Sequence, residues 1–140
     1  MQDRPSAIEL LEAAADFVDH EIVTATTGRV QFQSRVVANV MRIVAREIRD
    51  EDPFARAEMR SLAALLQCES PNVHGLDDVR RAVAKLNEDL SAKIRAGEAD
   101  SGPRRAQVLA AVRQIVENKL KIANPRYLEA DLAIRAERRA

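Results

Sequence analysis

Aromatic residues and cysteine are scarce in this chain of 140 residues. With no Trp and 3% aromatic residues, aliphatic side chains must fill any core, and platforms for stacking single-stranded bases are not expected. The single cysteine, Cys68, has no partner for an internal disulfide, and its place in an apolar run predicts a buried, reduced thiol. No apolar stretch approaches the ~18 residues of a membrane span. The N-terminus also has no signal-peptide pattern, so the expected location is cytoplasmic.

Net charge is absent as well, because 22 basic residues balance 22 acidic ones. The distribution is nevertheless uneven: the net charge is −5 over residues 1–28, +3 over residues 29–50 and +5 over residues 104–140. The acidic first segment is expected to lie against the basic last one, or one of them to face a partner. A neutral chain lacks the basic signature of nucleic-acid-binding proteins, so no nucleic-acid partner is expected.

The chain does contain helical periodicity along almost its whole length. Apolar residues recur every three or four positions, which is typical of amphipathic helices. The predicted helices cover about residues 6–23, 29–50, 53–68, 76–96, 103–122 and 127–138. Pro53 predicts a break between the second and third helices. The β-branched residues of the second helix, among them Val37, Val40, Val44 and Ile48, predict that this helix is buried.

Short connections between these helices favour antiparallel neighbours. We therefore expect an all-α fold, an up-and-down bundle of about five helices with a short C-terminal helix. The bundle domain is predicted over residues 1–128, and the tail helix over residues 129–140. The tail has too few apolar residues for a core of its own, so it should dock on the bundle or fray.

Catalytic and metal-binding motifs are missing. Bundles that hold a di-iron centre carry Glu-x-x-His, but Phe17 and Pro71 stand three positions before His20 and His74. Two isolated histidines and one cysteine give no zinc spacing. Neither a phosphate-binding loop nor a nucleophile elbow is present. We therefore expect no enzymatic activity, no cofactor and no metal.

Two polar segments supply the candidate binding residues. Arg35 and Asn39 are neighbours on one face of the second predicted helix, beside its apolar stripe, and must be hydrogen-bonded if buried. The second segment joins a helix end, a proline break and the only tyrosine, and its polar residues are Lys119, Asn124, Arg126 and Tyr127. These residues either tie the helices together, or Arg35, Asn39 and Arg126 converge on an anionic ligand.

The same segments resemble a small uncharacterised bacterial family of helical proteins, over about residues 2–128. The stretches that carry the resemblance are Gln2-Asp3-Arg4-Pro5, Gly28-Arg29, Arg35-Val36, Ala38-Asn39, Ile43-Val44-Ala45-Arg46-Glu47, Leu86-Asn87, Ile94-Arg95-Ala96-Gly97 and Asn124-Pro125-Arg126-Tyr127. Because Arg46 lies in one of these stretches, the resemblance adds it to the candidate binding residues. Members are typically encoded beside an aminoglycoside-phosphotransferase-like kinase and acyl-CoA dehydrogenases. The resemblance implies a non-catalytic accessory protein that binds such a kinase in acyl-CoA or hydroxy-acid catabolism. The alternatives are an anion-binding helical domain and a homodimer.

Overall fold

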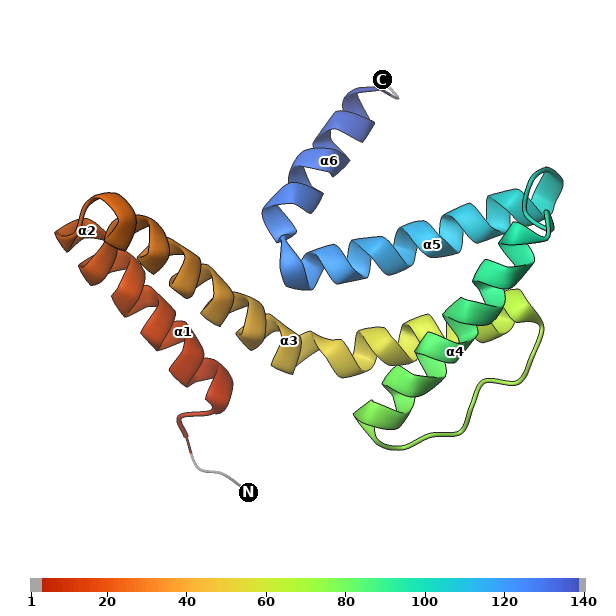
Figure 1. Cartoon of the computed structure of the whole chain (residues 1–140), viewed down its shortest axis with the longest axis horizontal. Coiled ribbons are helices and arrows are strands. Elements are labelled where there is room, and N and C mark those ends of the chain that lie inside the picture. Colours follow the sequence, from red (N-terminus) through yellow and green to blue (C-terminus); the bar gives the residue numbers. More distant parts are fainter. Residues whose placement is uncertain (1–3, 139–140) are drawn as a thin grey trace. The chain divides into compact units, whose positions relative to one another are not determined.

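The computed structural model describes residues 4–138; Gln2, Asp3 and Arg139 lie outside the described part. The described residues form helices and no strand, which confirms the all-α class. The helices are α1 (Ala7–Phe17), a π-helical turn (Val18–Ile22), α2 (Val23–Ala25), α3 (Gly28–Leu66), α4 (Leu76–Arg95), α5 (Gly102–Ala123) and α6 (Pro125–Glu137), as Figure 1 shows. Between residues 4 and 138, no helix has the length and apolar character needed to cross a membrane.

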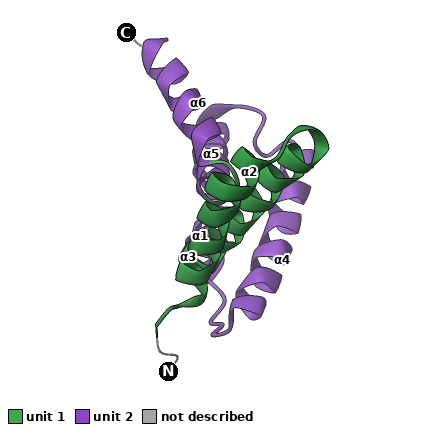
Figure 2. Cartoon of the chain, turned by 90° about the vertical axis from the view of Figure 1, so that its left-hand side faces the viewer, with its two compact units in different colours: residues 1–51, 122–124 green, residues 52–121, 125–140 purple. Residues whose placement is uncertain are grey.

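The chain divides into two compact units, coloured separately in Figure 2. Unit 1 comprises Met1–Glu51 and Ile122–Asn124, and unit 2 comprises Asp52–Lys121 and Pro125–Ala140. The first half of α3 therefore belongs to unit 1 and its second half to unit 2. The sequence predicts a separate tail from residue 129 onward, and the described residues of this tail, 129–138, belong to unit 2.

α3 is one helix where the sequence predicts two. Pro53 lies inside it, although an interior proline removes one hydrogen bond and costs about 3 kcal/mol. A break here would instead require a second nucleation event and would leave two further helix ends to satisfy. A continuous helix removes only the backbone partner of the Arg49 carbonyl, four residues earlier. The predicted break is therefore wrong.

In unit 1, α1 and the first half of α3 run antiparallel and side by side (Figure 1). A capping box starts α1, which a serine followed three positions later by a glutamate predicts. Ser6 N donates to Glu9 Oε2 at 2.6 Å, and Glu9 N donates to Ser6 Oγ at 3.2 Å. The buried apolar residues of the described part of unit 1 are small, namely Ala15, Val23, Ala38 and Ala45. The helix pair therefore closes over an alanine-rich contact.

Large apolar residues of α3 in unit 1 stay outside that contact. Val36 and Val37 are each 45% exposed, Val40 is 49% exposed and Ile48 is 54% exposed. The prediction of a buried helix is wrong for these residues, because only the face that carries the alanines meets α1. Their exposure leaves an apolar surface on unit 1.

Unit 2 holds the large buried side chains. One cluster joins the second half of α3 to α4 and α5, and its buried members are Met59, Leu62, Leu65, Val79, Leu86, Leu90, Val108 and Ile115. Val79, Leu86 and Leu90, which recur on one face of the predicted helix 76–96, lie in this core. Leu128 of α6 is also buried, at 6% exposure, so the start of α6 is packed.

The C-terminus of α3 closes in a Schellman arrangement. Cys68 N donates to Ala63 O at 3.1 Å and Gln67 N donates to Ala64 O at 3.2 Å. Gln67 has a φ of 56°, the left-handed conformation that this cap requires and that usually selects glycine. The turn carries Cys68 out of the helix, and its side chain is exposed. The predicted buried thiol is therefore wrong.

Candidate functional site

Three ion pairs fasten α1 and the π-helical turn after it to α3 in unit 1. Arg42 Nη1 lies 2.6 Å from Asp19 Oδ2, and Arg42 Nη2 lies 2.9 Å from Asp16 Oδ1. Arg49 follows Arg42 by two turns of α3, and Glu12 precedes Asp16 by one turn of α1. Arg49 Nη2 lies 2.6 Å from Glu12 Oε1. The hydrogen bonds to Asp16 and Asp19 raise the pKa of Arg42, because they favour its charged form. The acidic first segment thus meets the basic segment 29–50 in these pairs.

Arg46 lies beside these ion pairs. Its Nε donates to Ile122 O at 2.7 Å, which ties α3 to the three residues that α5 and the following connection contribute to unit 1. A surface depression of about 330 Å³ opens here, lined by Glu12, Asp16, Arg42, Arg46 and Arg49. Two of its three arginines are already paired with carboxylates, so the depression is largely neutralised from within.

A buried carboxylate links three helices in unit 2. Glu58 of α3 is 9% exposed, and its Oε1 accepts from Asn87 Nδ2 of α4 at 3.0 Å and from Lys119 Nζ of α5 at 3.2 Å. Asn87 Nδ2 also donates to Val83 O at 3.1 Å. A buried carboxylate is costly unless it is paired and hydrogen-bonded, and here it is both. Lys119, a binding candidate from the sequence, is thus part of an internal polar link.

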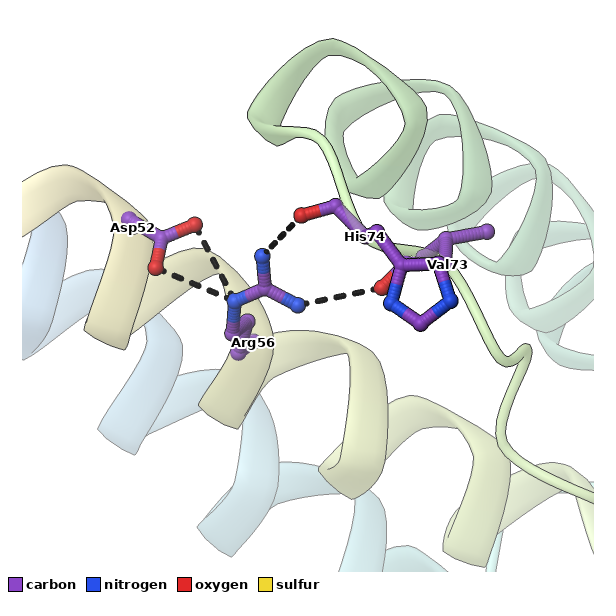
Figure 3. A network of polar contacts seen from close by, with 4 residues as sticks. All are labelled: Asp52, Arg56, Val73 and His74. Carbon is purple, nitrogen blue, oxygen red and sulfur yellow. Dashed lines mark hydrogen bonds and ion pairs between the residues drawn. The ribbon is translucent and has the colours of Figure 1, made fainter.

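Arg56 anchors the connection between α3 and α4 (Figure 3). Its Nε donates to both carboxylate oxygens of Asp52, at 3.0 and 3.1 Å. Its other nitrogens donate to Val73 O at 3.1 Å and to His74 O at 2.7 Å. One guanidinium therefore satisfies two loop carbonyls, and these hydrogen bonds fix the backbone of the connection between α3 and α4, which has no regular secondary structure.

The remaining sequence candidates lie at the surface. Arg35 and Asn39 are exposed on α3 of unit 1, and Asn124 is an exposed residue of the same unit. Arg126 and Tyr127 are exposed on α6 of unit 2, and Tyr127 is 59% exposed. The requirement for internal hydrogen bonds, which applies to buried polar groups, does not arise for these exposed side chains.

The sequence did not predict the structural contacts of three residues: Arg42, Arg56 and Glu58. For Arg42 a signal existed, since acidic residues three or four positions apart in one helix face arginines in the next. Arg56 and Glu58 gave no comparable signal, because a charged residue at the edge of an apolar stripe is usually solvated.

α5 carries an exposed apolar row, called here the α5 stripe: Leu109, Val112 and Val116. These residues are 56%, 38% and 47% exposed, while Val108 and Ile115 on the neighbouring face are buried. The helical spacing of these five residues predicts one broad core face, and the structure divides it into a buried row and an exposed row. Exposed arginines, Arg105 and Arg113, flank the α5 stripe. An apolar row with a basic border is characteristic of a surface that meets another protein.

The geometry defines an all-helical protein whose described residues contain no cluster of three or more potential metal ligands. Its buried charged side chain, Glu58, links helices, and its apolar stripes stay exposed. The chain belongs to the family described as a domain of unknown function, DUF6285, whose model matches residues 24–127. This match supports the resemblance to an uncharacterised family. No curated protein shows a significant match to the chain, and no solved structure does.

Proposed function

We propose that this protein is a non-catalytic accessory protein that binds a phosphotransferase-like kinase through the α5 stripe. The observation that carries the proposal is the exposure of Leu109, Val112 and Val116 in a helix whose neighbouring face, with Val108 and Ile115, is packed in the core. When a partner removes such side chains from water, the free energy falls by about 25 cal/mol per Å² of apolar surface buried. Their helix is already ordered, so little conformational entropy is lost on binding.

The border of the α5 stripe indicates the chemistry of the partner surface. Arg105, Leu109, Val112 and Val116 follow one another at intervals of four, three and four residues, which is the spacing of a helix-to-helix seam. Arg113 adds a second positive charge beside that seam. The complementary surface is an apolar helix or groove with acidic residues at its rim.

The kinase as partner comes from the family resemblance. Members of the resembled family are encoded beside an aminoglycoside-phosphotransferase-like kinase and acyl-CoA dehydrogenases. This neighbourhood supports a role in acyl-CoA or hydroxy-acid catabolism, in which the kinase does the chemistry and this chain supports it. A cytoplasmic location follows from such a role.

Co-expression of the chain with an aminoglycoside-phosphotransferase-like kinase of the kind encoded beside members of the resembled family, followed by size-exclusion chromatography, tests the proposal. We expect one co-eluting complex and a change in kinase activity when this protein is added. Leu109→Glu and Val116→Glu should each weaken the complex at least about tenfold, since each places a charge in an apolar interface. Arg105→Glu should weaken the complex less than these two variants do. The effect of Arg105→Glu should be larger at low salt than at high salt, because salt screens charges at the rim of an interface.

Ile134→Glu is the matched control, because Ile134 is 50% exposed on α6 of the same unit but lies outside the α5 stripe. It should bind the kinase as the unmodified chain does. Separate elution of the two proteins, with unchanged kinase activity, would disprove the proposal. Equal losses in Leu109→Glu and Ile134→Glu would show that the α5 stripe is not the contact.

A second candidate function is the binding of a small anion. It is favoured by the depression of about 330 Å³ in unit 1 that three arginines line. An anion there would compete with Glu12 and Asp16 for the guanidinium groups. Isothermal titration with inorganic phosphate and with acetate, on the unmodified chain and on Arg46→Met, tests it. Binding that is lost in Arg46→Met supports the candidate, and absence of heat ends it.

A further inference from the structure

The first half of α3 carries a row of residues at the spacing of a coiled-coil seam. The row, called here the α3 seam, consists of Arg29, Gln33, Val36, Val40, Ile43 and Glu47. Successive members are four, three, four, three and four residues apart. This alternation keeps side chains on one narrow face of a helix and lets them interlock with a second helix. The seam is about 27 Å long, at 1.5 Å per residue.

The α3 seam lies on the side of α3 that faces away from α1. Ala38 and Ala45, which pack against α1, are buried at 0% and 1% exposure. At 100° per residue, Val36 and Val40 point about 160° away from Ala38. Accordingly they are 45% and 49% exposed, and Phe32 beside them is 67% exposed. Unit 1 thus buries small residues inside and leaves larger ones outside.

The α3 seam is symmetric about Ala38. Val36 and Val40 each lie two positions from it, Gln33 and Ile43 five, and Arg29 and Glu47 nine. The apolar pair is therefore central, and the two ends carry opposite charges. Phe32 and Val44, each six positions from Ala38, flank the seam in the same symmetric way.

This pattern is self-complementary when two copies lie antiparallel. A two-fold axis at the level of Ala38 places Val36 against the partner's Val40, and Arg29 against the partner's Glu47, at both ends of the contact. A parallel pairing in register would instead place Arg29 against the partner's Arg29, and like charges would oppose it. The charges therefore select the antiparallel orientation.

We infer that the α3 seam is the contact of a homodimer, in which two copies pair antiparallel about Ala38. Two helix pairs joined in this way form a four-helix arrangement, in which Val36, Val40 and Ile43 are covered. This inference goes beyond the proposed function, because it uses unit 1 and a second copy of this chain.

Charge exchange at the ends of the seam tests both the interface and its orientation. Sedimentation velocity over a concentration series measures the dimer dissociation constant of the full chain and of three variants. Arg29→Glu and Glu47→Arg should each raise the constant about tenfold, because each creates two like-charge contacts. The double variant Arg29→Glu/Glu47→Arg should restore it. Arg29→Glu mixed with Glu47→Arg should form heterodimers in preference to either homodimer.

The exchanged side chains are exposed, so these variants should keep the circular dichroism spectrum of the unmodified chain. Arg105→Glu, in unit 2, is the control that should leave the dissociation constant unchanged. A monomer at every concentration would overturn the inference and would mean that another part of this chain, or a different protein, covers the seam. A dimer indifferent to all three exchanges would overturn it too. Because the α5 stripe variants are tested by kinase binding, failure of either proposal leaves the other measurable.

Discussion

Asn87→Ala tests whether the buried carboxylate of Glu58 depends on its neutral neighbour. Asn87 Nδ2 lies 3.0 Å from Glu58 Oε1, and a hydrogen bond to a charged group contributes about 1.5–3 kcal/mol. The side chain of Lys119, 3.2 Å from the same oxygen, is 64% exposed, so its ion pair contributes about 0–1 kcal/mol. We therefore expect Asn87→Ala to lower the free energy of unfolding by about 2 kcal/mol, and Lys119→Ala by less than about 1 kcal/mol.

Urea denaturation followed by far-ultraviolet circular dichroism measures these differences. Glu58→Met supplies the second background, because it removes the charge and keeps a long apolar side chain at a buried position. In that background Asn87→Ala should cost less than about 1 kcal/mol, which makes the coupling between Glu58 and Asn87 about 1–2 kcal/mol. Equal costs in the two backgrounds would refute the reasoning, and so would a larger loss for Lys119→Ala than for Asn87→Ala.

Three further predictions concern a helix end, an ion pair and the C-terminal helix. Gln67→Gly should stabilise the chain by about 0.5–1 kcal/mol, because glycine adopts a positive φ without strain. Thermal melts measure this change, and Ala64→Gly, at a helical position, is the control that should lose stability. Arg42→Met should destabilise it by about 1 kcal/mol, less in high salt, in urea titrations. Since the pKa of Arg42 is raised, its contribution is complete below the ordinary guanidinium pKa, and the loss should be equal at neutral and mildly alkaline pH. Truncation after Leu128 should cost at most about 1–3 kcal/mol and leave the helical spectrum of residues 4–128 intact; complete unfolding would make α6 part of the core.

Local rules predicted the helices well where one rule decided the outcome. The break at Asn124-Pro125 and the capping box of α1 are both properties of a few neighbouring residues, and both are present. Pro53 shows the limit of such rules. The same residue type can open a helix or lie inside one, and the choice depends on packing far along the chain, which a local pattern does not contain.

Burial was harder to predict than helicity. Val36 and Val40 have the composition of a buried helix, yet they lie outside the contact that Ala38 makes. A pattern of apolar residues says which faces avoid water, and it does not say which face a neighbour in the same chain covers. The candidate sites divide in the same way: Lys119 is tied to Glu58, and this link could not be derived from residues 61 positions apart.

The passage of the chain through its two units has a consequence for dissection. The backbone crosses the boundary at Glu51–Asp52, Lys121–Ile122 and Asn124–Pro125, so unit 1 is assembled from two separate segments. A peptide that ends at Glu51 lacks the Ile122 carbonyl to which Arg46 donates. Cleavage within residues 69–72 would yield two fragments, each holding a portion of both units. Reconstitution from such fragments should restore the Arg46 and Arg56 hydrogen bonds together, which makes this connection a natural place to split the protein for a complementation reporter.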